Sequence, residues 1–211
     1  YADVVLMAAE AANEMGGANI TEALADLELV RARARGTSTT LLPKITITDQ
    51  SKLRDTIRHE RRVEMGMEND RFFDLVRWGI AKDVFNAAGK ILKANGLQFC
   101  YHPHGYEFGS YKNGTLFDYL VKNTDARYVN FEMDVFWVKH PGQDPVALLK
   151  KYPRRFLLLH LKDRKPGTEG NQEGHAADET NVVLGQGDVG IAAIMKEAKK
   201  LGIEYCFIED E

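Results

Sequence analysis

The sequence has 211 residues, of which 44% are hydrophobic and 28% are charged, and its formal net charge is −3 at pH 7. Because these values are typical of globular proteins and neither part of the chain is strongly biased in charge, composition does not favour a nucleic acid or an anionic membrane as a partner. No apolar run approaches the ~20 residues that a membrane-spanning helix needs. No signal peptide is visible, so the sequence leaves the localisation unknown.

Helices are predicted for the first part of the chain. Small apolar residues recur at helical spacing from Val4 to Ala12, and Gly16-Gly17 should end that helix. A second helix is expected over residues 21–35, so that the two form an αα-hairpin of the tetratricopeptide kind. A third helix begins near Ser51, and a short aromatic-rich helix follows it in RFFDLVRWG.

The third helix carries the charged string IRHERRVE, whose charges fall three or four residues apart. Such a run is typical of a solvated face or of salt bridges between helices. The first part of the chain shows no nucleophile with a base and no cluster of metal ligands.

Helix and strand patterns alternate in the second part of the chain. The helix from Thr115 opens with a capping box that includes Asp118, and Asp188 is expected to cap the last helix. Four strands that alternate with helices predict a parallel α/β array. The strands are expected over residues 97–102, 127–135, 155–161 and 203–209, and the helices over residues 82–94, from 115, 144–152 and 189–200.

Each of the four predicted strands ends at a residue that can bind a metal. These residues are His102, Asp134, His160 and Glu209. In a parallel barrel, catalytic residues gather at the carboxyl ends of the strands. Two imidazoles and two carboxylates suit a divalent ion such as Mn, Co, Zn or Mg. The alternative is a salt-bridged barrel mouth without a metal, since buried ionisable groups need partners in either case.

A glycine-rich string, Gly185-x-Gly187-x-x-Gly190, precedes the last helix and imitates a dinucleotide-binding fingerprint. Against that interpretation, the strand before it is only about three residues long, and Asp188 stands where a pyrophosphate would approach. The preferred prediction is a loop that opens a helix. In that loop Gly185 and Gly187 would hold a phosphate or hydroxyl of the substrate.

Three strings in the first part resemble the C-terminal helical region of SusD/RagB proteins: YADVVLMAAEAANEMG, EALADLELVRARA and IRHERRVEMGMENDRFFDLVRWG. Those proteins are outer-membrane lipoproteins that capture glycans beside a TonB-dependent transporter. The resemblance covers residues 1–83 and implies an incomplete SusD-like helical segment. It also implies a TonB-dependent transporter as partner and a periplasmic or outer-membrane location.

The second part resembles the C-terminal half of sugar phosphate isomerase/epimerase proteins, which have the xylose isomerase-like TIM-barrel fold. The strings that carry the resemblance include GLQFCYHPHGYEF, RFLLLHLKDRKPGT and YCFIEDE. It implies a divalent metal at the strand ends and a small sugar or keto-sugar as substrate. Many relatives have Glu where His102 stands, which weakens a symmetrical two-glutamate epimerisation and leaves isomerisation or elimination open.

The implied chemistry is enediolate formation beside a Lewis-acid metal. Glu209, or Glu107 from the loop after the first strand, would remove the α-proton, while His104 and Lys162 would bind or protonate oxygens. Strand alternation places Glu132 one layer below the metal ligands as a substrate-binding residue. Trp137 would stack on a sugar face, although a core or rim position is equally open for it.

The predicted organisation is therefore an incomplete SusD-like segment over residues 1–83 and an incomplete xylose isomerase-like half barrel over residues 84–211. A closed barrel needs eight strands and about 250 residues. An incomplete enzyme, a glycan-binding fragment and a non-functional composite reading frame are all compatible with this pattern, and pairing of two halves in a homo-oligomer is open. Sequencing source DNA across residues 75–100 would test the composite reading frame.

Overall fold

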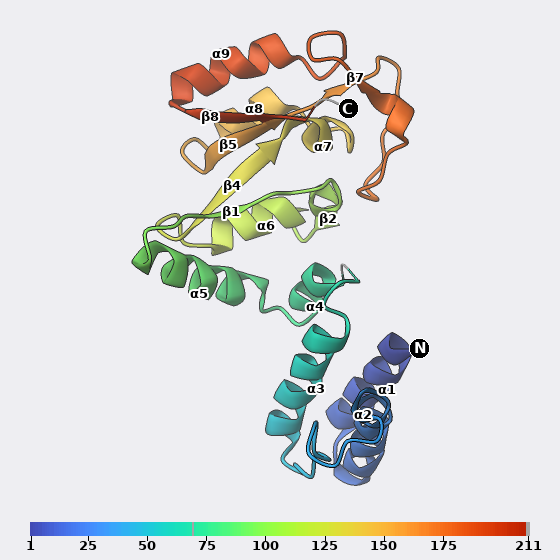
Figure 1. Cartoon of the computed structure of the whole chain (residues 1–211). Coiled ribbons are helices and arrows are strands. Elements are labelled where there is room, and N and C mark those ends of the chain that lie inside the picture. The colour runs from blue at the N-terminus through green and yellow to red at the C-terminus, as the bar shows by residue number, and fades with distance from the viewer. Residues whose placement is uncertain (69, 210–211) are drawn as a thin grey trace. The chain divides into compact units, whose positions relative to one another are not determined.

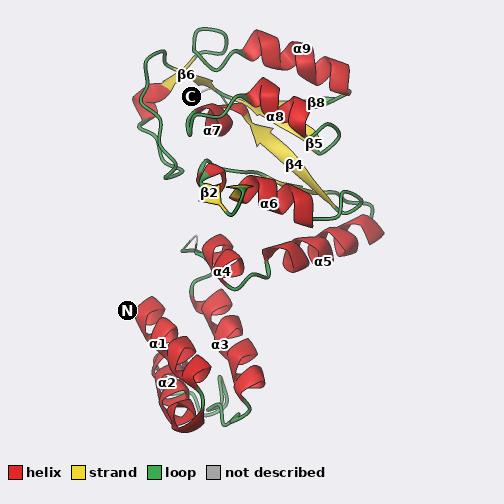
Figure 2. Ribbon diagram, turned by 180° about the vertical axis from the view of Figure 1, so that it is seen from behind, coloured by secondary structure: helices red, strands yellow, loops and turns green. Residues whose placement is uncertain are grey.

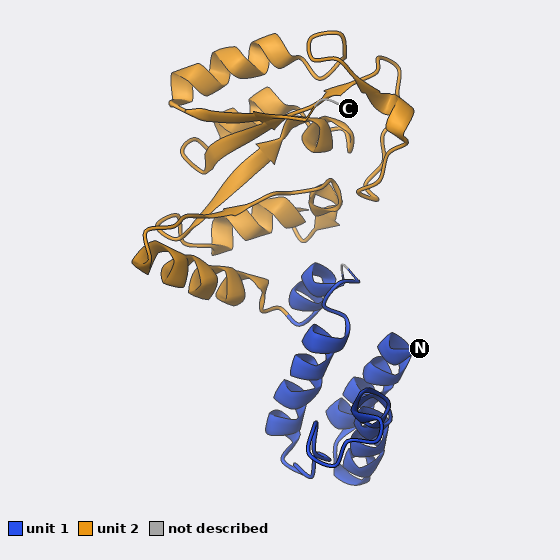
Figure 3. Cartoon of the chain, in the orientation of Figure 1, with its two compact units in different colours: residues 1–78 blue, residues 79–211 orange. Residues whose placement is uncertain are grey.

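A computed structural model describes residues 1–68 and 70–209. The chain divides into two compact units, unit 1 over Tyr1–Trp78 and unit 2 over Gly79–Glu211, shown in blue and orange in Figure 3. Within the described ranges, no helix combines the length and the apolarity that a membrane span requires.

Unit 1 is helical, as predicted. Its helices are α1 (Ala2–Met15), α2 (Ile20–Arg35), α3 (Gln50–Glu64) and α4 (Arg71–Arg77), with a 3-10 turn at Gly17–Asn19. Helices α1 and α2 pack as the expected hairpin, and α3 packs on α1. Their shared core is made of small and branched apolar residues: Leu6, Ala9, Ala12, Ala23, Leu27, Val30, Leu53 and Ile57.

The charges of α3 mostly pair with other helices. Arg31 of α2 lies 2.5 Å from Glu60, and both side chains are nearly buried. Arg61 is also buried and lies 3.0 Å from Asp74 of α4 and 2.8 Å from Asp3 of α1. Of the two interpretations of the charged string, salt bridges between helices are therefore the one that the structure shows.

Unit 2 contains a parallel sheet in the order β1-β4-β5-β8, which confirms the predicted α/β array (Figures 1 and 2). Its strands are β1 (Phe99–Tyr101), β4 (Val129–Asp134), β5 (Phe156–Leu161) and β8 (Tyr205–Ile208). The helices are α5 (Ala81–Ala94), α6 (Leu116–Asn123), α7 (Val135–Lys139), α8 (Pro145–Lys151) and α9 (Ile191–Leu201).

Two small antiparallel pairs and two 3-10 turns complete unit 2. The pairs are β2 (Ser110–Tyr111) with β3 (Gly114–Thr115), and β6 (Asp163–Arg164) with β7 (Asn181–Val182). The turns span Tyr106–Phe108 and Asp178–Thr180. The five-residue helix α7 was not predicted, because it begins directly after β4 and continues the same apolar run without a break.

Parallel register brings the strand ends to one edge of the sheet. Asp134 is aligned with His160, and His160 with Phe207, two residues before Glu209. Beneath this edge, aromatic residues fill the space between the sheet and α6. The rings of Phe117 and Phe156 are stacked with their centroids 5.8 Å apart. The strand ends are thus positioned by a packed layer of large side chains.

The predicted cap of the last helix is wrong. Helix α9 begins after Gly190, whose φ of 88° belongs to the left-handed region that favours glycine, and no side chain caps it. Asp188 instead pairs with Arg164, with the nearest nitrogen and oxygen 2.8 Å apart. The nearly buried guanidinium of Arg164 therefore binds the Asp188 carboxylate, which the sequence pattern had predicted to cap the helix.

The predicted capping box at Thr115 and Asp118 is present at the start of α6. Asp118 also accepts hydrogen bonds from Lys151 Nζ at 2.8 Å and from the Tyr152 hydroxyl at 2.6 Å. Burial alone would raise the pKa of Asp118, but these bonds and that of the Thr115 amide outweigh burial and hold its pKa below the ordinary value. The carboxylate thus ties α6 to the end of α8.

We expect Asp118→Asn to lower the free energy of unfolding by about 2 kcal/mol at neutral pH, because a charged acceptor and a helix cap are lost. A carboxyl group with a depressed folded pKa stabilises above its unfolded pKa of about 3.9 and loses that contribution as pH falls. The difference between the two proteins should therefore shrink in acid. Urea titrations at several pH values measure it, and the exposed Asp83→Asn variant is the control. An unchanged difference in acid would contradict the prediction.

Candidate metal centre

Asp134 is the centre of the group of side chains at the strand ends. It is 1% exposed and stands at the end of β4. Its Oδ1 atom accepts the Trp137 amide at 3.0 Å and caps α7. Its Oδ2 atom lies 3.3 Å from His102 Nε2 and 3.1 Å from His160 Nδ1. One carboxylate therefore ends a strand, starts a helix and faces two imidazoles.

The surroundings of Asp134 keep it ionised. Burial opposes the charge, but contacts with His102 and His160 and the Trp137 amide outweigh burial and hold its pKa at about 2. Burial acts to lower the pKa of His102, but Asp134 and Glu132 together raise it above the ordinary value, and Asp134 is the main cause of the raised pKa of His160. The group is thus a buried anion that attracts cationic partners.

Two further carboxylates border the histidines. His160 Nε2 lies 3.6 Å from Glu209, and Lys162 Nζ lies 3.4 Å from the other oxygen of Glu209. On the opposite side, His102 Nδ1 lies 3.6 Å from Glu132. The structure therefore brings the four predicted metal ligands together, with Glu132 and Lys162 beside them.

The spacing of these atoms suits a metal ion. The residues offer two overlapping triads, His102–Glu132–His160 and Asp134–His160–Glu209, in each of which the ligand atoms lie within 4.8 Å of one another. His160 Nδ1 is buried and lacks a well-formed hydrogen bond among the described residues.

His104 and Trp137 stack on each other at the rim of this group. Their ring centroids are 4.2 Å apart, and His104 Nδ1 lies 3.0 Å from the Gly174 carbonyl oxygen. Burial lowers the pKa of His104. Trp137 is only 7% exposed, so of the two positions left open for it, the core or rim position is the one observed.

Glu107 lies in the turn after β1, as expected, but the protein encloses its side chain. It is fully buried; one oxygen accepts the Tyr101 hydroxyl and the other accepts the His104 amide at 2.9 Å. Burial raises its pKa despite these bonds. The carboxyl group holds the segment that carries His104 and so positions that residue, while its role as a base stays a prediction.

The glycine-rich loop is also occupied by the protein itself. Asp163 is buried and accepts the amides of Gly185 at 2.9 Å, Gly187 at 3.0 Å and Val189 at 3.2 Å. Both glycine amides are therefore already bonded to Asp163, and their binding of a substrate phosphate or hydroxyl stays a prediction. The strand before the loop, β7, is antiparallel to β6, which excludes the dinucleotide-binding interpretation.

We expect Asp163→Ala to lower the free energy of unfolding by about 3 kcal/mol, because several amides would lose a charged acceptor in a buried place. Proteolysis should then cut the loop near Gly185 faster than in the parent protein. The exposed Asp178→Ala variant is the control for loss of a carboxylate. Equal cutting rates in the two variants would show that Asp163 does not hold the loop.

Comparisons with known proteins match both units. The SusD family matches residues 1–140, a range that runs past the end of unit 1 at Trp78. A SusD-like protein of Formosa agariphila is 42% identical over 83 residues, which cover 39% of this chain and 15% of that protein.

The other matches are sugar-modifying enzymes. An inosose dehydratase of Clostridium beijerinckii is 30% identical over 97 residues, which are 46% of this chain. The chain spans about a third of that enzyme's length, 32%. The crystal structure of a sugar phosphate isomerase/epimerase from Parabacteroides distasonis superposes with a TM-score of 0.51 at 32% identity, covering 63% of this chain and 45% of the other.

These matches confirm both resemblances seen in the sequence, and the parallel sheet with its helices corresponds to part of a TIM barrel. The chain belongs to the SusD family, and it joins the helices of that family to a partial barrel of the sugar phosphate isomerase/epimerase kind.

Proposed function

We propose that unit 2 binds a divalent metal ion and acts on a small sugar or keto-sugar through an enediolate. The observation that carries the proposal is the convergence of His102, Asp134, His160 and Glu209 from four parallel strands, with contacts of 3.1 to 3.6 Å between neighbours. The similarity to an inosose dehydratase and to a sugar phosphate isomerase/epimerase supports the substrate class.

The residues have distinct tasks in this proposal. Asp134, ionised and buried, orients both imidazoles as ligands. A divalent ion held there would supply Lewis acidity for the negative charge of the enediolate. Glu209 removes the α-proton, because its side chain remains 34% exposed and within reach of a substrate.

Lys162 and Glu132 complete the proposed site. Lys162 lies 3.4 Å from Glu209, so its ammonium can bind or protonate a substrate oxygen next to the base. Glu132 shares the face of Asp134 and borders His102, where it can accept a substrate hydroxyl or serve as an additional ligand. His104, held by Glu107 and Trp137, borders the site from the rim.

His160 belongs to both triads, so His160→Ala should lower metal affinity by at least about 100-fold. Equilibrium dialysis of the full chain against Zn²⁺ or Mn²⁺, followed by metal analysis, measures the effect. His175→Ala removes an exposed loop histidine and should leave the metal content unchanged. Equal metal content in the two variants, or a parent protein that retains no metal, would refute the proposed centre.

A second candidate function is glycan capture, which is favoured by the family match over residues 1–140. In this proposal the helices of unit 1 are the scaffold of a glycan-binding protein that works with a TonB-dependent transporter. The indole of Trp78, an aromatic side chain of unit 1, already contacts other side chains of that unit. Trp78 donates its Nε1 hydrogen to Glu10, and the guanidinium groups of Arg58 and Arg77 lie 4.7 and 4.9 Å from its ring.

If unit 1 captures glycans, titration calorimetry with soluble oligosaccharides should give saturable heat with the full chain. The same heat is expected from His160→Ala, since binding would not involve the metal group. Absence of heat across a series of oligosaccharides would count against this function and leave the metal centre untouched.

A further inference from the structure

The exposed apolar side chains of unit 2 gather on the first and last elements of its sheet. On the side of α5 and β1, Ile91 is 65% and Leu97 58% exposed. On the side of α9 and β8, the exposed residues are Met195, Tyr205, Phe207 and Ile208, with β8 contributing three of the four. Among the described residues of unit 2, only Val183 is a comparable exposed residue elsewhere.

The outer strands also have open backbone edges. Among the described strands, β1 pairs with β4 only and β8 with β5 only. The Glu209 amide donates to the Leu161 carbonyl of β5 at 3.1 Å. Because successive amides of a strand point to opposite sides, those of Cys206 and Ile208 face the open edge. Exposed edges are usually protected by charge or proline, and Tyr205–Ile208 has neither.

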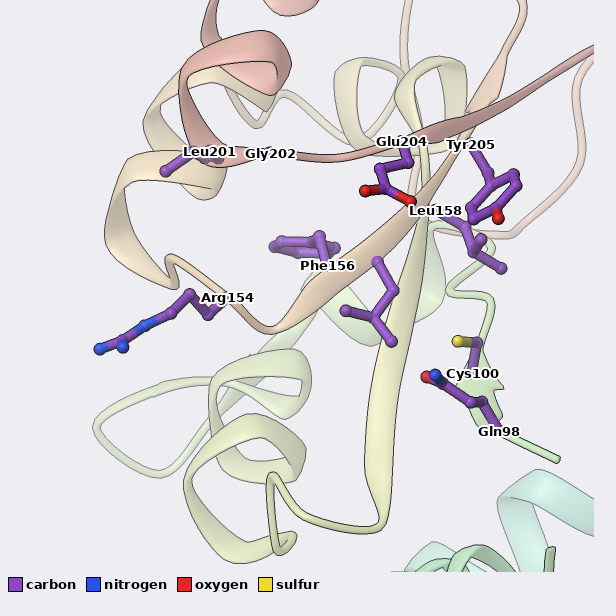
Figure 4. A pocket seen from close by; sticks show the side chains of 10 residues that line it. Gln98, Cys100, Arg154, Phe156, Leu158, Leu201, Gly202, Glu204 and Tyr205 are labelled. Carbon is purple, nitrogen blue, oxygen red and sulfur yellow. The ribbon is translucent and has the colours of Figure 1, made fainter. Parts of the chain in front are cut away.

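A pocket of about 620 Å³ lies between the two outer strands, on the same face of the sheet as the metal centre. Figure 4 shows its lining from β5 and β8, with Leu158 and Tyr205, and from the β1 side, with Gln98 and Cys100. In a closed barrel, this face would be filled by packed layers of side chains from all eight strands. Unit 2 thus presents an unfilled barrel interior between two unpaired edges.

We propose that a second copy of this chain closes the barrel. The strand order β1-β4-β5-β8 is uninterrupted and wholly parallel, so β8 of one copy can pair with β1 of its partner. A two-fold axis along the barrel repeats this contact and gives eight strands, the number that closes a TIM barrel. All strands then run in one direction, and both metal centres lie at the same rim.

The exposed apolar residues fit this arrangement. Alternation turns Tyr205 and Phe207 toward the barrel interior, with Glu209, and turns Ile208 toward the helical layer. At the seam, α5 of the partner lies over the new strand pair and beside α9, so Ile91 and Met195 become covered. The pairing depends on the half-barrel fold and not on the metal.

Sedimentation equilibrium of the full chain tests the proposal. A mass of twice 23.8 kDa is expected for the parent protein. Ile91→Lys and Ile208→Lys place a charge at opposite edges, so each should shift the protein to a monomer. Val183→Lys, with a similarly exposed apolar residue away from both edges, should remain a dimer. Circular dichroism checks that each variant is folded.

Hydrogen exchange gives a second measurement that does not depend on a variant. The Cys206 and Ile208 amides should be protected from exchange at protein concentrations where the dimer forms, and should exchange fast after dilution to the monomer. The Glu209 amide should stay protected in both cases, because it keeps its bond to β5. A parent protein that stays monomeric, a mass that grows beyond a dimer, or a dimer unaffected by both edge variants would overturn the proposal. Metal analysis of monomeric Ile91→Lys then reports on the metal centre separately.

Discussion

The site depends on the contacts of one ionised carboxylate, that of Asp134. Its burial is tolerable only because each oxygen has a partner: the start of α7 on one side and two imidazoles on the other. The same contacts raise the pKa values of both histidines above the ordinary value. A metal ion would replace the protons as the source of positive charge, which links the stability of this strand end to the occupancy of the centre.

The two units differ in whether their polar and apolar groups find partners within the unit. In unit 1, buried charges are paired between helices, as Arg31 is with Glu60, so the helices carry their own partners. In unit 2, the described strands leave apolar side chains exposed and backbone groups unpaired at both edges of the sheet. The SusD family match runs from unit 1 into the residues of β1 and β4, whereas the sheet itself resembles an isomerase/epimerase barrel.

Two sets of predicted site groups are hydrogen-bonded within the protein itself, and the physical reason is the same in both cases. The amides of Gly185 and Gly187 attract an anion, as expected of a glycine-rich loop, but the anion is Asp163 of the neighbouring strand. Glu107 satisfies a hydroxyl and an amide and thereby holds His104. Amides and carboxyl groups that can bind a ligand can equally bind a side chain or the backbone of the protein, and the local sequence does not distinguish the two.

The sequence by itself determined the order of the longer helices and of the four parallel strands, the α/β class and the four residues at the strand ends. These follow from periodicity, caps and the rule that side chains alternate along a strand, all of which are local. Only the tertiary structure decided that Asp134 lies between His102 and His160, that Asp188 pairs with Arg164 and not with α9, and that Trp137 packs on His104. Those outcomes depend on distances between segments far apart in the chain, which register and packing set and which no short stretch of sequence encodes.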